Sequence, residues 1–190
     1  MKIKRLFDLA CFFFASMVFS PFFILISAAI LLDDGRPLFF RQERVGRGRR
    51  PFMILKFRTM RDGQVTRAGV ALRRTGLDEL PQFLNILLGD MSFVGPRPLT
   101  QADIARLGWA NSRSDFRWRL RPGITGFAQI FAGTGAAESL ARRSLVRDRF
   151  YLGHRSVLWD MKILVITFAM NFLGKARVKR WMIGYRGSQA

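Results

Sequence analysis

The longest apolar stretch of the chain lies near its N-terminus. Residues 9–32 contain no Asp, Glu, Lys or Arg, and as a helix they are long enough to span a bilayer core of about 30 Å. Ser20-Pro21 falls near the middle of this stretch, where proline removes a helix hydrogen bond and bends the axis. The pattern therefore predicts an apolar, membrane-associated helical segment that is broken at Ser20 and Pro21.

Positive charges on both sides of this stretch favour a segment that enters the membrane and returns. Lys and Arg favour the cytoplasmic side of a membrane, so two basic flanks place both ends there. Each half of the broken helix would have about 12 residues and a length of about 18 Å, too short to cross alone. We expect a re-entrant helical hairpin over residues 1–36, and an ordinary spanning anchor remains the alternative. The flanking basic residues are Lys2, Lys4 and Arg5 before the stretch, and Arg36, Arg41, Arg44, Arg47, Arg49 and Arg50 after it.

The rest of the chain alternates short apolar patches with turn signals. Apolar patches at residues 38–40 and 52–55 flank the turn-prone Gly46-Arg47-Gly48, which predicts a pair of short strands. We interpret residues 61–69 as a loop. Leucines then recur at helical spacing, so a helix is expected from its N-cap Asp78, through Pro81 in its first turn, to Gly89.

Three further helices are predicted in the second half of the chain, over residues 102–109, 138–151 and 159–173. The last of these is apolar but contains Asp160 and Lys162. It suits a helix that lies in the membrane interface with Trp159 at headgroup level, or equally a core helix. We therefore expect a mostly helical α+β fold with a small β element. Residues 37–190 would form a domain at the cytoplasmic face, seated by interfacial helices.

The composition adds a large positive charge to this apolar pattern. The chain has 32 Lys and Arg against 13 Asp and Glu, a formal net charge of +19. Such an excess favours an anionic partner, whether nucleic acid, an acidic membrane surface or a phosphorylated substrate. Because 49% of the residues are hydrophobic, the membrane surface is favoured over a soluble nucleic-acid-binding protein.

Two adjacent carboxylates, Asp78 and Glu79, are candidates for chemistry. An anion at a helix start is stabilised by free backbone N–H groups and by the helix dipole. One carboxylate can attack phosphorus as a nucleophile, while a second can accept a proton or hold a metal ion. Such pairs are also common as solvated caps, so the pair alone does not establish a catalytic site.

Basic residues in stiff loops are candidates for binding phosphate. Arg97 lies between Pro96 and Pro98, and Arg121 precedes Pro122. An arginine held in this way is preorganised for bidentate phosphate contact. Lys56 and Arg58, on either side of Phe57, are weaker candidates. The sequence contains no phosphate-binding loop motif, no Cys/His zinc spacing and no motif typical of nucleic-acid recognition, so no nucleic acid partner is expected.

The order of several motifs resembles the bacterial sugar transferases, specifically the small monotopic polyprenyl-phosphate phosphoglycosyl transferases. The resemblance runs along nearly the whole chain. The loop at residues 61–69 is shorter than in many relatives, and the motif at residues 148–151 is only partly kept. We expect the chain to belong to the small class, which lacks the extra spanning helices that larger relatives carry before this part. The matching segments are residues 4–8, the break at Ser20-Pro21, and residues 37–46, 56–60, 72–82, 89–92, 94–99, 121–126, 148–151 and 160–164.

The resemblance implies a covalent mechanism. Asp78 would attack the sugar-linked phosphorus of a UDP-sugar and release UMP, and Glu79 would assist transfer of the phospho-sugar to polyprenyl (undecaprenyl) phosphate. Mg²⁺ would be the cofactor, with Asp78 among its ligands. Arg97 and Arg121 would bind phosphate, with Lys56 and Arg58 less firmly assigned.

The resemblance also implies a location and a pathway. Ser20-Pro21 would be the re-entrant break, which seats the chain on the inner leaflet of the bacterial cytoplasmic membrane with its active site on the cytoplasmic face. The reaction would be the first membrane step of exopolysaccharide, O-antigen or glycoprotein glycan synthesis. A homodimer is compatible with the sequence but not required by it. The rival hypothesis is a membrane-tethered basic protein that binds anionic lipid or nucleic acid without catalysis.

Overall fold

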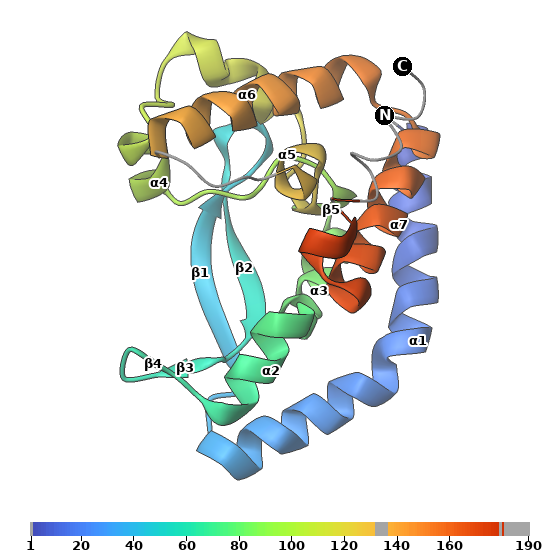
Figure 1. Cartoon of the computed structure of the whole chain (residues 1–190), viewed down its shortest axis with the longest axis vertical. Coiled ribbons are helices and arrows are strands. Elements are labelled where there is room, and N and C mark those ends of the chain that lie inside the picture. Colours follow the sequence, from blue (N-terminus) through green and yellow to red (C-terminus); the bar gives the residue numbers. More distant parts are fainter. Residues whose placement is uncertain (1, 132–136, 179, 181–190) are drawn as a thin grey trace.

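Helices make up most of the part of the chain that the structure describes. The structure is a computed structural model, and it describes residues 2–131, 137–178 and 180. Within these residues the strands form three two-stranded sheets, so the predicted mostly helical class with a small β element is confirmed (Figure 1). The predicted domain of residues 37–190 includes residues 132–136, 179 and 181–190, which lie outside the described residues. Its boundary stays a prediction.

The helices are α1 (Lys2–Asp34), α2 (Arg67–Thr75), α3 (Gln82–Leu88), α4 (Gln101–Arg106), α5 (Phe127–Ile130), α6 (Ala137–His154) and α7 (Val157–Leu173). The strands are β1 (Phe39–Val45), β2 (Pro51–Phe57), β3 (Met60–Arg61), β4 (Gln64–Val65), β5 (Ser92–Val94) and β6 (Gly123–Thr125). Three 3₁₀ turns, η1 (Arg47–Arg49), η2 (Leu77–Glu79) and η3 (Ser112–Arg119), complete the described elements. The predicted strand pair and the helices expected near residues 102–109, 138–151 and 159–173 are confirmed.

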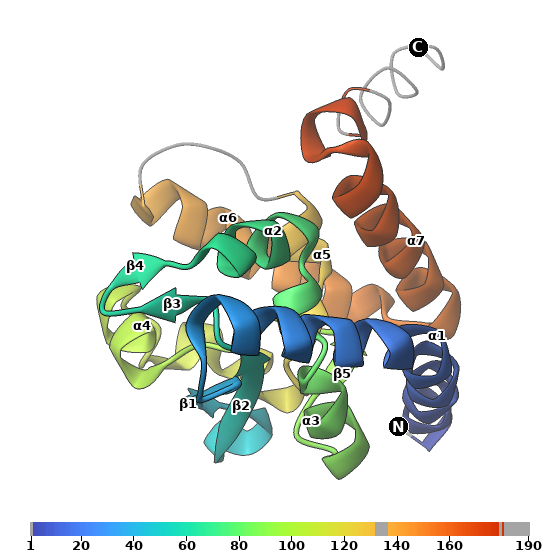
Figure 2. The same cartoon turned by 90° about the horizontal axis from the view of Figure 1, so that it is seen from below.

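The apolar N-terminal stretch forms one long helix with a bend. Helix α1 contains Pro21, and Figure 1 and Figure 2 show its ribbon changing direction partway along. The Ser20 hydroxyl donates to the carbonyl of Met17 at 3.1 Å. By length and composition α1 could cross a membrane, and much of its apolar surface is exposed. The structure gives a continuous bent helix, so the re-entrant hairpin itself stays a prediction.

The region between β2 and α3 differs from the expected loop and cap. The expected loop of residues 61–69 contains most of the β3–β4 hairpin and the start of α2. Helix α2 begins there because the Thr66 hydroxyl accepts a bond from Gly69 N at 3.0 Å and caps it. Asp78 is not the N-cap of α3. Gly76 adopts a left-handed conformation (φ 76°), and this turn redirects the chain into η2, which carries Asp78 and Glu79. Helix α3 begins only after Pro81 and ends at Gly89, as expected.

Strands β5 and β6 join two loops that are far apart in the sequence. They pair in parallel, with Ser92 opposite Gly123 and Val94 opposite Thr125. The backbones approach so closely that a Cβ at Gly123 would lie 2.1 Å from the nitrogen of Gly95. A Cβ at Gly126 would lie 2.1 Å from the oxygen of Gly95. Because only glycine permits this contact, the glycines link the Arg97 loop to the Arg121 loop.

Substitution of Gly123 is expected to destabilise the fold strongly. In Gly123→Ala the added methyl group meets backbone atoms, which cannot move aside as a flexible side chain would. We expect a loss of about 3 kcal/mol or more in the free energy of unfolding, measured by denaturant titration. Gly153→Ala is the matched control, because its Cβ meets nothing within 4 Å and alanine favours a helix. Equal stability of the two variants would contradict the argument.

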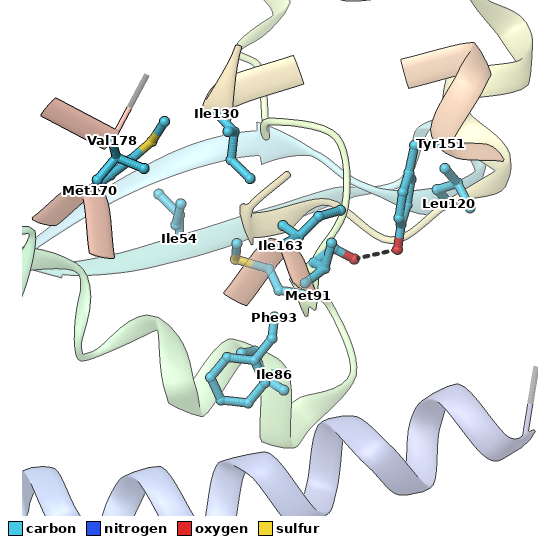
Figure 3. Packing of buried hydrophobic residues seen from close by; sticks show 11 residues of the cluster. Ile54, Ile86, Met91, Phe93, Leu120, Ile130, Tyr151, Ile163, Met170 and Val178 are labelled. Atoms are coloured by element: carbon cyan, nitrogen blue, oxygen red, sulfur yellow. Dashed lines mark hydrogen bonds between the residues drawn. The ribbon is translucent and has the colours of Figure 1, made fainter. Parts of the chain in front are cut away.

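The largest buried cluster brings together side chains from α3, α5, α6, α7 and strands β2 and β5. Figure 3 shows Ile86 and Phe93 on the side of this cluster that faces the α1 ribbon. Helix α7 contributes Ile163 and Met170 to the cluster. Its other face is apolar and exposed, so α7 is a core helix on one side. Contact of the other side with a membrane stays a prediction. The exposed apolar residues of α7 are Leu158, Met161, Val165, Phe168, Phe172 and Leu173.

A buried polar network fixes the first turns of α1 on this core. The Asp8 carboxylate, fully buried, accepts bonds from the Ser92 hydroxyl at 2.9 Å and from Phe93 N at 3.2 Å. The Lys4 ammonium contacts the buried Asp160 carboxylate of α7 at 2.5 Å. The Tyr151 hydroxyl donates to the same carboxylate at 2.6 Å, and its weaker contact with the carbonyl of Val94 is drawn in Figure 3. The apolar helix is therefore tied to the rest of the fold by charged groups.

Candidate active site

A cleft of about 1080 Å³ collects most of the predicted site residues. It lies between the β1–β2 sheet, η2, the Arg97 loop and helices α5 and α7. Asp78, Glu79, Lys56, Arg58 and Arg97 all line it. Residues separated by up to 41 positions in the sequence therefore face one space, as the candidate assignments require.

The two carboxylates of η2 differ in their surroundings. The Glu79 carboxylate contacts the Lys56 ammonium at 2.5 Å, and both side chains are partly buried. Among the described residues, Asp78 forms no ion pair at contact distance. Burial raises the pKa of the Asp78 carboxyl, the charge of Glu79 raises it further, and Lys56 and Arg73 oppose the rise. Asp78 is thus the carboxylate whose oxygens stay available to a ligand, and Glu79 is held by Lys56.

Arg58 lines the cleft, but its guanidinium is hydrogen-bonded to the end of α1 and to the residues that follow it. Its guanidinium donates to the carbonyls of Pro37 at 2.6 Å and Gly35 at 2.8 Å, and it pairs with the Asp34 carboxylate. These contacts anchor the chain where it leaves the apolar helix. The geometry indicates a structural role for Arg58, and phosphate binding by this residue stays a prediction.

Arg97 is exposed in the cleft, and its backbone is fixed from behind. The carbonyl of Arg97 accepts a bond of 2.6 Å from the guanidinium of Arg117. Arg117 in turn pairs with the Asp148 carboxylate at 2.8 Å, and both of these side chains are almost fully buried. The rings of Trp109 and Trp118 stack on the same guanidinium. A rigid support therefore presents the Arg97 side chain to the cleft.

Arg121 lies elsewhere. It lines a second, smaller cavity near the N-terminal end of α1 and does not line the cleft. The β5–β6 pairing joins the Arg121 loop to the Arg97 loop, yet the side chains of Arg121 and Arg97 line different cavities. Phosphate binding by Arg121 stays a prediction, and the structure separates it from Asp78.

Sequence reasoning did not single out several polar residues of the cleft. Arg44 lines it and donates to the carbonyl of Pro98 at 3.3 Å, beside Arg97. Gln129 lines it too, and its amide nitrogen is buried without a hydrogen-bond partner in the described chain. A buried donor of this kind is available to a ligand in the cleft. No local pattern marks Gln129, whereas Arg73 and Arg74 precede Asp78 in the same segment of residues 72–82 that carries the resemblance. The other polar side chains of the cleft are those of Gln42, Thr59, Arg73, Arg74, Thr75, Thr125, Thr167, Asn171 and Lys175.

The donor set fits a magnesium ion that is shared with a substrate. No group of three or more His, Cys, Asp or Glu side chains that could hold a metal occurs among the described residues. Mg²⁺ is usually bound by one or two carboxylates together with water and substrate phosphates, so such a group is not required. Asp78 offers a carboxylate without an ion pair, and Glu79 is adjacent to it. These two residues would hold the ion.

Comparison with known proteins identifies relatives of this chain. The chain is 35% identical over 190 residues to the UDP-glucose:undecaprenyl-phosphate glucose-1-phosphate transferase of Escherichia coli (strain K12), covering 92% of this chain and 41% of that protein. It is 36% identical over 186 residues to the UDP-N-acetylgalactosamine-undecaprenyl-phosphate N-acetylgalactosaminephosphotransferase of Aeromonas hydrophila, covering 90% of this chain and 44% of that protein.

A third relative has a similar length. The exopolysaccharide production protein PSS of Rhizobium leguminosarum bv. phaseoli is 36% identical over 187 residues, covering 87% of this chain and 92% of that protein. The chain thus spans less than half the length of the first two relatives. The model of the family described as "Bacterial sugar transferase" matches residues 1–174, nearly the whole chain. The chain therefore belongs to the bacterial sugar transferase family.

Proposed function

We propose that the chain is a polyprenyl-phosphate sugar-1-phosphate transferase (EC 2.7.8.-), which moves a sugar 1-phosphate from a UDP-sugar to undecaprenyl phosphate and releases UMP. The observation that carries the proposal is the position of Asp78, a carboxylate with no ion pair to any described residue, in a cleft lined by Lys56, Arg73 and Arg97. Support also comes from the names of the relatives, which describe such transfers for two different sugars. The product would enter exopolysaccharide or another bacterial glycan.

In the first half of the proposed reaction, a carboxylate oxygen of Asp78 attacks the sugar-linked phosphorus of the UDP-sugar. A bond forms between that oxygen and phosphorus, and the bond from phosphorus to the bridging oxygen breaks. UMP leaves with the bonding electron pair, and the sugar phosphate stays on Asp78 as an acyl phosphate. Arg97, Arg73 and Arg44 surround the cleft with positive charge and favour the diphosphate there.

In the second half, a phosphate oxygen of undecaprenyl phosphate attacks the same phosphorus. The acyl phosphate bond breaks, Asp78 is regenerated as a carboxylate, and the product is undecaprenyl diphosphate linked to the sugar. Glu79, which contacts Lys56 at 2.5 Å, would accept a proton from the incoming phosphate. Mg²⁺, when bound, would neutralise charge on the diphosphate and on the leaving group.

The acceptor is a membrane lipid, so the cleft must open close to the bilayer. Helices α1 and α7 contact each other and expose large apolar side chains such as Phe13, Phe14 and Phe168. We propose that these faces seat the chain on the inner leaflet of the cytoplasmic membrane as a monotopic protein. The bend at Ser20-Pro21 would return α1 to the cytoplasmic face.

The test of the proposal is UMP release by the full chain in detergent with Mg²⁺, undecaprenyl phosphate and a panel of UDP-sugars. UMP release over many turnovers that requires both one UDP-sugar and the lipid supports the transferase and identifies the sugar, whereas without the lipid at most one UMP per chain should be released. The absence of release with every UDP-sugar would favour the rival hypothesis of a non-catalytic binding protein. The mass of the lipid product, measured in parallel, excludes simple hydrolysis of the UDP-sugar.

The pH dependence of the first half-reaction should reflect the surroundings of Asp78. Only the ionised carboxylate attacks, so the rate falls as pH drops through the pKa of Asp78, which burial has raised. Lys56 lowers this pKa, so Lys56→Met should move the acid limb of the rate profile to higher pH. The measurement is the rate of UMP release without acceptor from pH 4.5 to 9. An unshifted or lower limb in the variant would contradict this assignment.

A further inference from the structure

The second cavity has a composition that the proposed reaction does not use. It has a volume of about 340 Å³ and lies where the first turns of α1 meet the junction of α6 and α7 (Figure 1). None of the residues that line it also lines the cleft with Asp78. Its walls combine apolar and basic side chains: Ile3, Leu120 and Val157 with Lys4, Arg47, Arg119, Arg121 and Arg155, together with Asp8 and Ser156.

Among the described residues, three of the five basic side chains that line this cavity form no ion pair with a carboxylate, whereas Lys4 pairs with Asp160 at 2.5 Å. In the described chain, no ion pair joins Arg119, Arg121 or Arg155 to an Asp or Glu. Asp8 also lines the cavity: one of its carboxylate oxygens accepts from Ser92 and from the backbone N–H of Phe93, and the other is buried without a hydrogen-bond partner among the described residues. Burial and the positive charges of Arg5 and Arg47 lower the pKa of Arg121. Cations gathered against one another in this way are stabilised by an anion that binds among them.

The apolar surroundings indicate which kind of anion fits. Ile3 and Leu6 of α1 are 75% and 70% exposed, and Leu158 of α7 is 71% exposed. These side chains lie within the first turns of the two helices whose outer faces are apolar along their length. A free phosphate would contact only the arginines, whereas a phospholipid would also cover the apolar side chains with its acyl chains. Basic pockets between membrane-facing helices are typical sites for anionic headgroups.

We propose that this cavity binds the headgroup phosphate of an anionic glycerophospholipid, with the acyl chains lying along α1 and α7. The site is separate from the catalytic cleft, and its lipid is a structural ligand rather than a substrate. Because Lys4 belongs to α1 and Arg155 lies in the segment between α6 and α7, the bound lipid would also set the depth at which α1 and α7 lie in the membrane.

The experiment is a calorimetric titration. Short-chain dihexanoylphosphatidylglycerol, below its critical micelle concentration, is added to the detergent-solubilised full chain and the heat of binding is measured. One saturable site is expected, with at least about tenfold weaker binding of dihexanoylphosphatidylcholine. Arg119→Gln combined with Arg155→Gln should weaken binding of phosphatidylglycerol about tenfold or more, since each cation near an anionic headgroup contributes roughly fivefold. Both arginines are exposed, so the variant should fold, and an unchanged thermal midpoint verifies this.

The matched control is Arg113→Gln combined with Arg142→Gln, which removes the same charge from exposed positions outside the cavity. This control should bind phosphatidylglycerol within twofold of the unsubstituted chain. Equal weakening of both variants would overturn the proposal, because binding would then follow net charge alone. Binding of glycerol 3-phosphate as tight as that of phosphatidylglycerol would overturn the lipid assignment in favour of a free-phosphate site. No saturable binding of phosphatidylglycerol would overturn the site itself.

Discussion

Asp78→Asn should abolish sugar phosphate transfer, with UMP release reduced by about 10⁴-fold or more. The amide is nearly the same size as the carboxylate but is too weak a nucleophile to form the bond to phosphorus. It also removes one of the two carboxylates that fit Mg²⁺. Intact-mass spectrometry of the full chain with UDP-sugar, without acceptor, provides a second readout. The unsubstituted chain should gain the mass of one sugar phosphate, and the variant should gain none.

The control for this substitution is Asp62→Asn. Asp62 is in the β3–β4 turn with a side chain that is 96% exposed, and its positive φ of 49° is a conformation that asparagine tolerates. Its rate should stay within twofold of the unsubstituted chain. If Asp78→Asn kept its rate or its mass adduct, Asp78 would not be the nucleophile, and Glu79 would be tested next by the same two measurements.

Asp160→Asn should cost about 3 kcal/mol or more in the free energy of unfolding. The carboxylate of Asp160 is 1% exposed and receives both the Lys4 ammonium and the Tyr151 hydroxyl. Without the Asp160 carboxylate, the partly buried Lys4 ammonium keeps only its longer contact of 4.0 Å with Asp8, and loss of a partner from a buried ion pair is strongly destabilising. Burial and the charge of Asp160 raise the pKa of Tyr151, so its hydroxyl stays protonated as the donor. The measurement is denaturant-induced unfolding in detergent.

Asp115→Asn provides the comparison, because Asp115 forms an ion pair of 2.7 Å with Arg49 on the surface. Exposed pairs contribute at most about 1 kcal/mol, so this variant should unfold close to the unsubstituted chain. If Asp160→Asn lowered the free energy of unfolding no more than Asp115→Asn does, water would reach the network around Lys4.

The sequence predicted elements well where the signal was local. The apolar helix, the β1–β2 pair and helix α7 all follow from hydrophobic spacing, and Gly89 ends α3 as expected. The error at Asp78 came from Gly76, whose left-handed turn inserts η2 before α3. The hydrophobic spacing is the same for both arrangements, so spacing alone could not distinguish them.

The candidate site was predictable in part, for a different reason. Asp78, Glu79, Lys56 and Arg97 line one cleft, and the roles that the resemblance implies for them stay predictions. Arg121 does not join them, because the parallel β5–β6 pairing places its loop beside the Arg97 loop while the two side chains line separate cavities. The contacts of Arg117 and the unpartnered amide of Gln129 depend on long-range packing, which no sequence motif encodes.

The polar attachment of α1 has a consequence for making the protein in soluble form. Deleting the apolar helix would seem the simplest route to a water-soluble fragment. Such a fragment would lose Asp8, which accepts from Ser92 and Phe93 N beside the core, and Arg5, which caps the carbonyls of Ile86 and Leu87 at the end of α3. It would therefore leave hydrogen-bond donors and acceptors of the remaining domain without their partners. Production of this chain is better directed at detergent or nanodisc preparations that keep residues 2–34.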